Sequence, residues 1–256
     1  MDSKPTLAFF GATGGCVLAV LTLSLQAGYS CTALVRTPSK LSRLLSVNSV
    51  PQENLNIVEG NVKDPAAVTK TLLGRSIIIS GVGGVPKFTP NPFRPTLDDP
   101  VICQSATRNI VSCLQEIQKS AGVEYKPPLL AVISSTGLDP KTPDLAWALV
   151  PLYKILLAIP HADKEVMEEV VVAAPPGLLE YVIVRPGFLT DGAAGQKTVK
   201  AGYDGRVQKG DGRWGDVKGV VSGYTISRAD VGRFLFEEVV TREGGEWKGK
   251  KVSLVY

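Results

Sequence analysis

The chain has 256 residues, of which 44% are hydrophobic and 20% charged, and this suits one α/β domain with a large core. The formal net charge is +4, but Lys and Arg are spread along the chain, which favours anionic small molecules over nucleic acid. No run approaches the length of a membrane span and no export signal is visible, so we expect a cytoplasmic protein. The four cysteines show no CxxC spacing, which indicates reduced thiols, and no metal site is expected.

Short apolar segments alternate with helical patterns along the chain, as in a parallel sheet that is covered on both faces. Strands are predicted at 6–10, 31–35, 55–58, 76–80, 129–134, 181–184 and 251–255. Helices are predicted at 16–27, 65–73, 101–120, 162–173 and 228–240. Asp64 before Pro65 and Ser227 before Arg228 are good helix caps. The pattern predicts a single α/β domain over 1–256, with a Rossmann-like, doubly wound parallel sheet.

Two segments interrupt this alternation. The proline-rich segment 85–100 and the glycine-rich segment 187–223 are predicted to be loops over the carboxyl edge of the sheet. Doubly wound folds bind their ligands at that edge. Because 187–223 has many glycines and few long apolar runs, we expect it to be a mobile lid over a substrate site.

The first predicted strand is followed by the sequence GATGG at 11–15, which opens an apolar helix. In this position, backbone N–H groups and the helix N-terminus can face a pyrophosphate. The usual third glycine is replaced by Val17, which predicts a slight outward shift of the helix and no lost phosphate contact. A tight β–α turn without a ligand is the alternative. The expected cofactor contacts of this loop are Gly11, Thr13, Gly14 and Gly15.

The end of the second predicted strand indicates which nucleotide is bound. A free ribose 2′-hydroxyl favours an acidic residue there, whereas this chain has Arg36 and Lys40 and no acid beside them. A guanidinium can hold a 2′-phosphate through two hydrogen bonds. The sequence therefore favours NADP(H), with an ordinary solvated loop as the alternative.

Six motifs together carry a resemblance to a known family. They are GATGG at 11–15, VRTPSKL at 35–41, GNVKD at 60–64, SGVG at 80–83, VRPG at 184–187 and ISRADV at 226–231. Over nearly its whole length the chain resembles an atypical short-chain dehydrogenase/reductase of the NmrA-like, NAD(P)-binding branch, including fungal proteins with a PH-x-DK-x-x-ME segment. The resemblance implies cofactor contacts at Asn61 and Val62 near the adenine, at Ser80, Gly81 and Val82 near the nicotinamide ribose, and at Pro186 and Gly187 under the nicotinamide.

Standard members of that superfamily use a Ser, a Tyr and a Lys, with the Lys four residues after the Tyr. Here Ser135 follows the fifth strand, and Lys164 can supply the lysine, which also holds the ribose. Pro160 stands where the tyrosine is expected, and the chain contains no Tyr-x-x-x-Lys. His161 and Asp163 are the nearest titratable replacements for the missing proton donor.

This stretch has a structural alternative. Asp163 would then interact with the N-terminal dipole of its own helix, and Lys164 would form a surface pair with Glu168. Aromatic residues that are candidates for shaping a substrate pocket are Trp147, Tyr153, Phe188, Tyr203 and Trp214.

We therefore expect an NADP(H)-dependent reductase of a small carbonyl, imine or enone substrate in secondary metabolism, acting as a monomer or homodimer. One alternative is a non-redox biosynthetic enzyme, a cyclase or isomerase, that retains NADP. Another is a redox sensor that binds NADP and a partner protein. NADPH consumption with a panel of substrates separates the first reading from the other two.

Overall fold

The structure is a computed structural model that describes residues 4–87, 96–138, 144–151, 153, 157–203 and 219–256. The strands of its main sheet are β1 (Leu7–Phe10), β2 (Cys31–Val35), β3 (Leu55–Glu59), β4 (Ile77–Ser80), β7 (Leu129–Ile133), β8 (Glu180–Pro186), β10 (Lys200–Tyr203) and β12 (Lys250–Val255). The helices are α1 (Gly15–Gln26), α2 (Pro38–Val47), α3 (Pro65–Leu72), α4 (Ile102–Ala121), α6 (Ala158–Val172) and α7 (Arg228–Phe234), which continues into the π-helical stretch η3 (Leu235–Val240).

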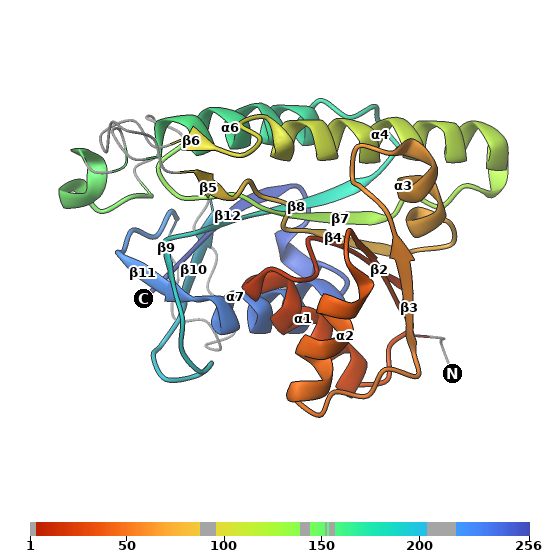
Figure 1. Ribbon diagram of the computed structural model, residues 1–256. Coiled ribbons are helices and arrows are strands. Elements are labelled where there is room, and N and C mark those ends of the chain that lie inside the picture. Colours follow the sequence, from red (N-terminus) through yellow and green to blue (C-terminus); the bar gives the residue numbers. More distant parts are fainter. Residues whose placement is uncertain (1–3, 88–95, 139–143, 152, 154–156, 204–218) are drawn as a thin grey trace.

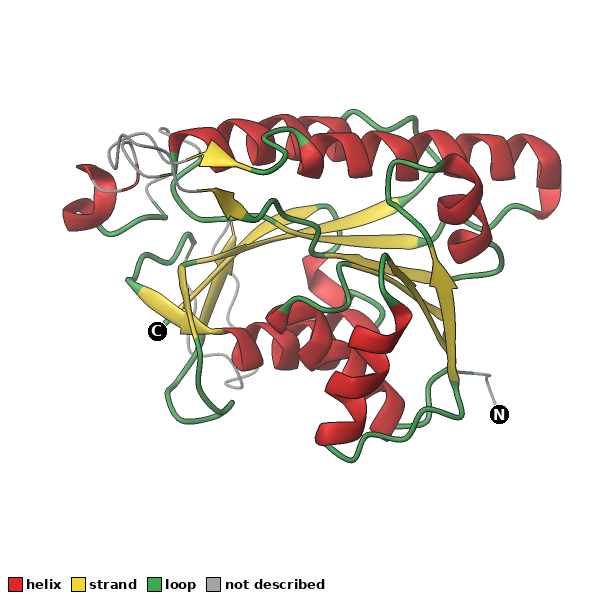
Figure 2. Cartoon of the chain, in the orientation of Figure 1, coloured by secondary structure: helices red, strands yellow, loops and turns green. Residues whose placement is uncertain are grey.

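The strand order of the eight-stranded sheet is β10-β12-β8-β7-β4-β1-β2-β3. All neighbouring strands run parallel except β10, which is antiparallel to β12 at one edge. Helices α3, α4 and α6 cover one face, and α1, α2 and α7 cover the other (Figure 1). The layers are plain in Figure 2, where the sheet lies between two sets of helices. This is the doubly wound arrangement that the alternating pattern predicts.

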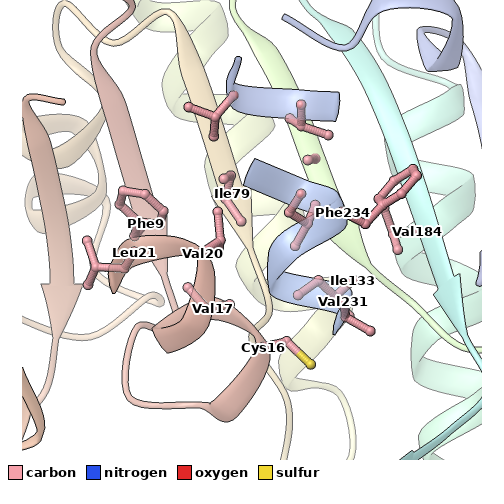
Figure 3. Close-up of a cluster of buried hydrophobic side chains, with 14 of the residues drawn as sticks. Phe9, Cys16, Val17, Val20, Leu21, Ile79, Ile133, Val184, Val231 and Phe234 are labelled. Carbon is pink, nitrogen blue, oxygen red and sulfur yellow. The ribbon is translucent and has the colours of Figure 1, made fainter. Parts of the chain in front are cut away.

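Alternate residues of the central strands supply two separate cores. Phe9 of β1 and Ile79 of β4 point toward α1 and α7, whereas Phe10 points to the opposite face. In Figure 3, Leu21 of α1 lies beside Phe9 and Val20 lies near Ile79, while Phe234 of α7 lies near Val184 of β8. Because both faces are buried, the strands read as continuous apolar runs.

The fold confirms the seven predicted strands and the five predicted helices, with shifted ends. The helix predicted at 162–173 begins earlier, at Ala158, so Pro160 lies in its first turn, where the proline ring breaks no helical hydrogen bond. Helix α2 was not predicted from the sequence. It starts with Pro38 after the N-cap Thr37 and buries only Leu41 and Leu45. Its short apolar stripe explains why the sequence signal is weak.

The two expected loops require correction. Within 85–100, residues of β5 (Pro86–Lys87) pair antiparallel with β6 (Thr96–Leu97), and 88–95 lie outside the described residues. Within 187–223, β9 (Phe188–Thr190) pairs with β11 (Thr225–Ser227), and β10 joins the main sheet. Tyr203 of β10 is buried against Trp247, which fixes this part of the segment in the fold. Residues 204–218, including Trp214, lie outside the described residues, and the lid role stays a prediction.

Within the described ranges, no helix has the length and apolarity needed to cross a membrane. The same residues contain no cluster of three or more His, Cys, Asp or Glu side chains suited to a metal ion. The cysteines Cys16, Cys31, Cys103 and Cys113 are buried free thiols.

Candidate cofactor and active site

A cleft of about 340 Å³ opens at the carboxyl ends of β1, β2, β3 and β4. In the sheet, β2 lies on one side of β1 and β4 lies on the other, so the strand order reverses at β1. Doubly wound folds bind their ligands at such a switch point. The residues that line the cleft are Gly11, Thr13, Gly14, Leu34, Arg36, Lys40, Gly60, Asn61, Val62, Lys63, Gly81, Val82, Gly83, Val85, Asp98, Asp99 and Ile102. Of the predicted cofactor residues, Gly15, Ser80, Lys164, Pro186 and Gly187 are not part of this lining.

The glycine loop at the base of the cleft is shaped for close backbone approach. Gly11 has a φ of +79°, and a Cβ there would lie 2.7 Å from the carbonyl oxygen of Gly81. Gly14 is the N-cap of α1, which has neither a side-chain cap nor an acidic residue in its first turn. The N-terminal N–H groups of α1 are therefore open to an anion, as a pyrophosphate site requires.

Val17, in place of the usual third glycine, is 1% exposed and packs against Gly81. A Cβ on Gly81 would overlap the Val17 side chain, so the glycine of β4's outgoing loop makes room for the valine of α1. A third glycine in this motif usually lets the helix pack closely on the strand. In this chain Gly81, after β4, provides the space for that close packing.

Cationic side chains stand at the β2 end of the cleft. Arg36 and Lys40 are both exposed and both line the cleft. Beside them, Asn61 accepts a hydrogen bond from the backbone N–H of Lys63 at 3.0 Å and so fixes the turn after β3. Asn109 of α4 donates to the carbonyl oxygen of Val62 at 2.8 Å. The turn therefore has a fixed shape, which suits a site for one side of a flat base.

Two acidic residues of the cleft lining, Asp98 and Asp99, were not predicted from the sequence. The Asp99 carboxylate pairs with Lys63 at 2.5 Å, and this contact is the main cause of its lowered pKa. The Asp98 carboxylate accepts from the backbone N–H of Val85 at 2.7 Å. Both acids are thus engaged, and they join the segment before α4 to the turn after β3. The only sequence signal was an Asp-Asp-Pro ahead of a helix, which reads as a cap.

Lys164 of α6 reaches the end of β7. Its Nζ donates to the backbone oxygen of Ser134 at 2.6 Å, and burial lowers its pKa. Ser134 in turn donates to Glu168 at 2.6 Å, and Ser135 follows as a half-buried residue. The proposed surface pair between Lys164 and Glu168 is wrong, because Glu168 is buried and binds Arg185 through hydrogen bonds of 2.9 and 2.6 Å.

Asp163 has a structural partner that the sequence did not indicate. Its two carboxylate oxygens accept from the backbone N–H groups of Cys103 at 2.8 Å and Gln104 at 2.9 Å. Asp163 is 1% exposed and therefore caps the N-terminus of α4, not that of its own helix. With both oxygens engaged, it is poorly placed to orient a proton donor.

His161 lies one turn before Lys164, and its ring contacts Tyr153 edge-on with centroids 5.4 Å apart. Within the described structure, its Nε2 is buried without a hydrogen-bond partner. Burial, together with the nearby Lys164 charge, lowers the pKa of His161 to about 4, so the imidazole is neutral at physiological pH. Burial raises the pKa of Tyr153, and an interaction with the side chain of Thr136 opposes that rise.

The strand order, the glycine loop and the cleft define a Rossmann-fold dinucleotide-binding protein. A family model described as NAD(P)H-binding matches residues 11–241. The chain therefore belongs to the NAD(P)H-binding family, and its resemblance to atypical, NmrA-like short-chain dehydrogenases/reductases is confirmed.

Two curated fungal proteins match nearly the whole chain. Reductase pytE from Aspergillus terreus is 41% identical over 277 residues, covering 100% of this chain and 99% of that protein. Oxidase pynE from Aspergillus niger is 39% identical over 287 residues, covering 98% of this chain and 99% of that protein. Because these relatives are named as a reductase and an oxidase and the family is NAD(P)H-binding, the chain is an oxidoreductase that uses a nicotinamide cofactor.

Solved structures share the fold at low sequence identity. A short-chain dehydrogenase/reductase from Veillonella parvula in complex with NADP has a TM-score of 0.68 at 14% identity, covering 99% of this chain and 95% of that one. ChuY, an anaerobilin reductase from Escherichia coli O157:H7, has a TM-score of 0.64 at 20% identity, covering 98% and 97%. These likenesses confirm the predicted Rossmann-like architecture.

Proposed function

We propose that the protein is an NADP(H)-dependent reductase of a small carbonyl, imine or enone substrate in secondary metabolism. The observation that carries the cofactor choice is the cationic end of the cleft, where Arg36 and Lys40 follow β2. The acids in the same cleft, Asp98 and Asp99, are engaged by backbone N–H groups and Lys63. Arg36 and Lys40 are therefore the groups available to a 2′-phosphate, and a free 2′-hydroxyl has no acidic partner after β2.

The bound nicotinamide supplies the hydride, and the protein supplies alignment and proton control. The open N-terminus of α1 holds the pyrophosphate through its N–H groups. Lys164 is the proposed partner of the nicotinamide ribose, because its contact with Ser134 brings its ammonium to the end of β7. Ser135, Pro186 and Gly187 are proposed neighbours of the same half of the cofactor, since β7 and β8 are adjacent strands.

The pair of His161 and Tyr153 is the proposed proton source in place of the missing tyrosine. Tyr153 has a raised pKa and keeps its proton at neutral pH, and the neutral His161 can relay one. Asp163 is not included, because its carboxylate caps α4. A buried polar atom without a partner calls for an explanation, and within the described residues His161 Nε2 is such an atom.

The test is a panel of small ketones, imines and enones incubated with the purified protein and NADPH, with oxidation of NADPH followed at 340 nm. We expect at least one compound class to consume NADPH and to yield the reduced product by mass spectrometry. NADPH that binds but is not consumed by any class would contradict the proposal.

A second function is favoured by Pro160, which occupies the place of the usual proton-donating tyrosine. A non-redox cyclase or isomerase that retains NADP transfers no hydride to a carbonyl and so needs no donor for the resulting alkoxide. In the same panel, that enzyme would convert a substrate into an isomer of equal mass without net NADPH oxidation.

A further inference from the structure

Arg228 reaches the N-terminal turn of α1 from a distant part of the chain. It is the first residue of α7, and a Cβ built on Gly15 would overlap its Cδ. Figure 3 shows α1 and α7 in contact, with Cys16 beside Val231 near the beginnings of the two helices. Arg228 therefore passes directly over Gly15, within the glycine loop. A side chain at position 15 would displace it.

The base of Arg228 is held rigidly. Ser227 caps α7 by accepting from the N–H of Asp230 at 3.0 Å. The Asp230 carboxylate accepts from the Tyr256 hydroxyl at 2.6 Å and from the N–H of Gly195 at 2.9 Å. The start of α7 is thus fixed by buried contacts, while the Arg228 side chain is 36% exposed and is bound at its tip by Asp191.

The position of the Arg228 charge is unfavourable in the absence of an anion. The N-terminus of α1 is the positive end of its dipole and has no acidic residue in its first turn. Arg228 and Lys164 both lie near enough to act on the Cys16 thiol in that turn, and both oppose the rise that burial causes in its pKa. The balancing carboxylate is that of Asp191, at 2.8 Å from Arg228 Nη1, and its side chain is 94% exposed.

Such an exposed ion pair is weak and easily exchanged for a better partner. A phosphate at the open end of α1 would offer Arg228 charge-assisted hydrogen bonds and would also neutralise the local excess of positive charge.

We propose that Arg228 is a further cofactor-binding residue, which leaves Asp191 and closes on the pyrophosphate of the bound dinucleotide. The inference rests on the proposed function, since it requires the dinucleotide in the cleft. It also links cofactor binding to the segment after β9, which loses its anchor at Asp191 while Gly195 stays bound to Asp230.

The experiment measures dissociation constants for NADPH and NADH by fluorescence titration. Arg228→Ala should weaken both by the same factor, about tenfold or more, because the pyrophosphate is common to both nucleotides. Arg36→Ala should weaken NADPH alone. Asp191→Ala should tighten both by about two- to fivefold, because it removes the competing carboxylate, and should have no effect in the Arg228→Ala background. Arg108→Ala removes an exposed arginine of α4 that is not part of the cleft lining, and it controls for the lost charge.

Each outcome is decisive. Unchanged affinities in Arg228→Ala would overturn the inference, and so would an Asp191→Ala variant that loses as much affinity as Arg228→Ala. A wild-type protein that binds neither nucleotide would instead contradict the proposed function. If Arg228→Ala does not fold, as judged by circular dichroism, Asp191→Ala and the charge-conserving Arg228→Lys still give the test, because Arg228→Lys should bind less tightly than wild type through loss of the two-pronged contact.

Discussion

At the scale of single residues, Arg36 is the proposed source of a preference for NADPH over NADH. A bidentate contact between a guanidinium and a 2′-phosphate is absent with NADH, and an aspartate at the same place would favour the free ribose hydroxyl. We expect NADPH to bind about tenfold or more tightly than NADH, and Arg36→Asp to abolish that preference. Fluorescence titration of both nucleotides measures it. Equal affinities in the wild-type protein would show that Arg36 is only a solvated loop residue.

His161 offers a test of its burial, since it is the single histidine of the chain. Its pKa falls from 6.5 to about 4 in the folded protein, so the unfolded chain binds more protons between these values. Stability contributed by the neutral imidazole is therefore present above pH 6.5 and is lost as the pH falls toward 4.

We expect the unfolding free energy of the wild-type protein to fall by roughly 1–2 kcal/mol more than that of His161→Gln between pH 7 and pH 4. Urea unfolding at each pH measures this difference, and the single imidazole resonance gives the folded pKa directly by NMR. An imidazole that titrates near pH 6.5 in the folded protein would contradict the burial argument.

At the scale of elements, two glycines in the turn between β1 and α1 have different roles, Gly11 in the backbone conformation and Gly14 in access to the cleft. Gly11 has a positive φ and lies against Gly81, so Gly11→Ala strains the backbone and forces the two loops apart. Gly14 has φ −86° and ψ 142°, which any residue adopts, and it faces the cleft. Gly11→Ala should therefore lower stability by about 1–3 kcal/mol.

Gly14→Val should leave the fold intact and abolish NADPH binding, because its side chain occupies the space of the pyrophosphate. Thermal unfolding followed by circular dichroism and nucleotide titration separate the two effects. Normal NADPH binding by Gly14→Val would mean that the loop is a tight turn without a phosphate role.

Helix α6 caps α4 through Asp163 and carries His161, which contacts Tyr153, and two variants separate these roles. Asp163→Asn removes a charged cap from α4 and should destabilise the fold by about 1–2 kcal/mol, with turnover retained in the folded fraction. Tyr153→Phe should keep the fold and NADPH affinity but lower kcat by roughly 10²-fold, if its hydroxyl delivers the proton. Steady-state kinetics with the substrate found in the panel measure both. A large fall in kcat for Asp163→Asn at unchanged stability would show that Asp163 takes part in the proton transfer.

At the scale of the whole molecule, buried charges connect the sheet to α6. Arg185 of β8 binds Glu168 of α6, and Lys251 of β12 joins them at 3.0 Å. The Asp144 carboxylate accepts from Ser253 at 3.0 Å and lies 3.7 Å from Arg185. This network supports the end of β7, where Ser134 and Lys164 meet, and removal of one partner leaves an uncompensated buried charge.

Much of this architecture was predictable because it depends on local patterns. Apolar runs of strand length, caps such as Asp64, and glycines placed between a strand and a helix each act over a few neighbouring residues. They gave the order of the parallel sheet's elements, the glycine loop and the cations after β2. Helix α2 was not predicted because its buried stripe consists of only two leucines. Strand β10 was not predicted because its sequence, KAGY, includes a lysine and a glycine, which are uncommon in strands.

The sequence by itself determined the Rossmann-like fold, the nicotinamide cofactor and the absence of the usual tyrosine, since each depends on residue type and short spacing. Only the tertiary structure decided that Asp163 caps α4, that Lys63 meets Asp99, and that Arg228 lies over Gly15. These contacts join segments far apart in the chain. Their partners are set by how helices pack on the sheet and on one another. The residue type of a polar side chain does not reveal whether that side chain contacts a substrate, a helix end or water.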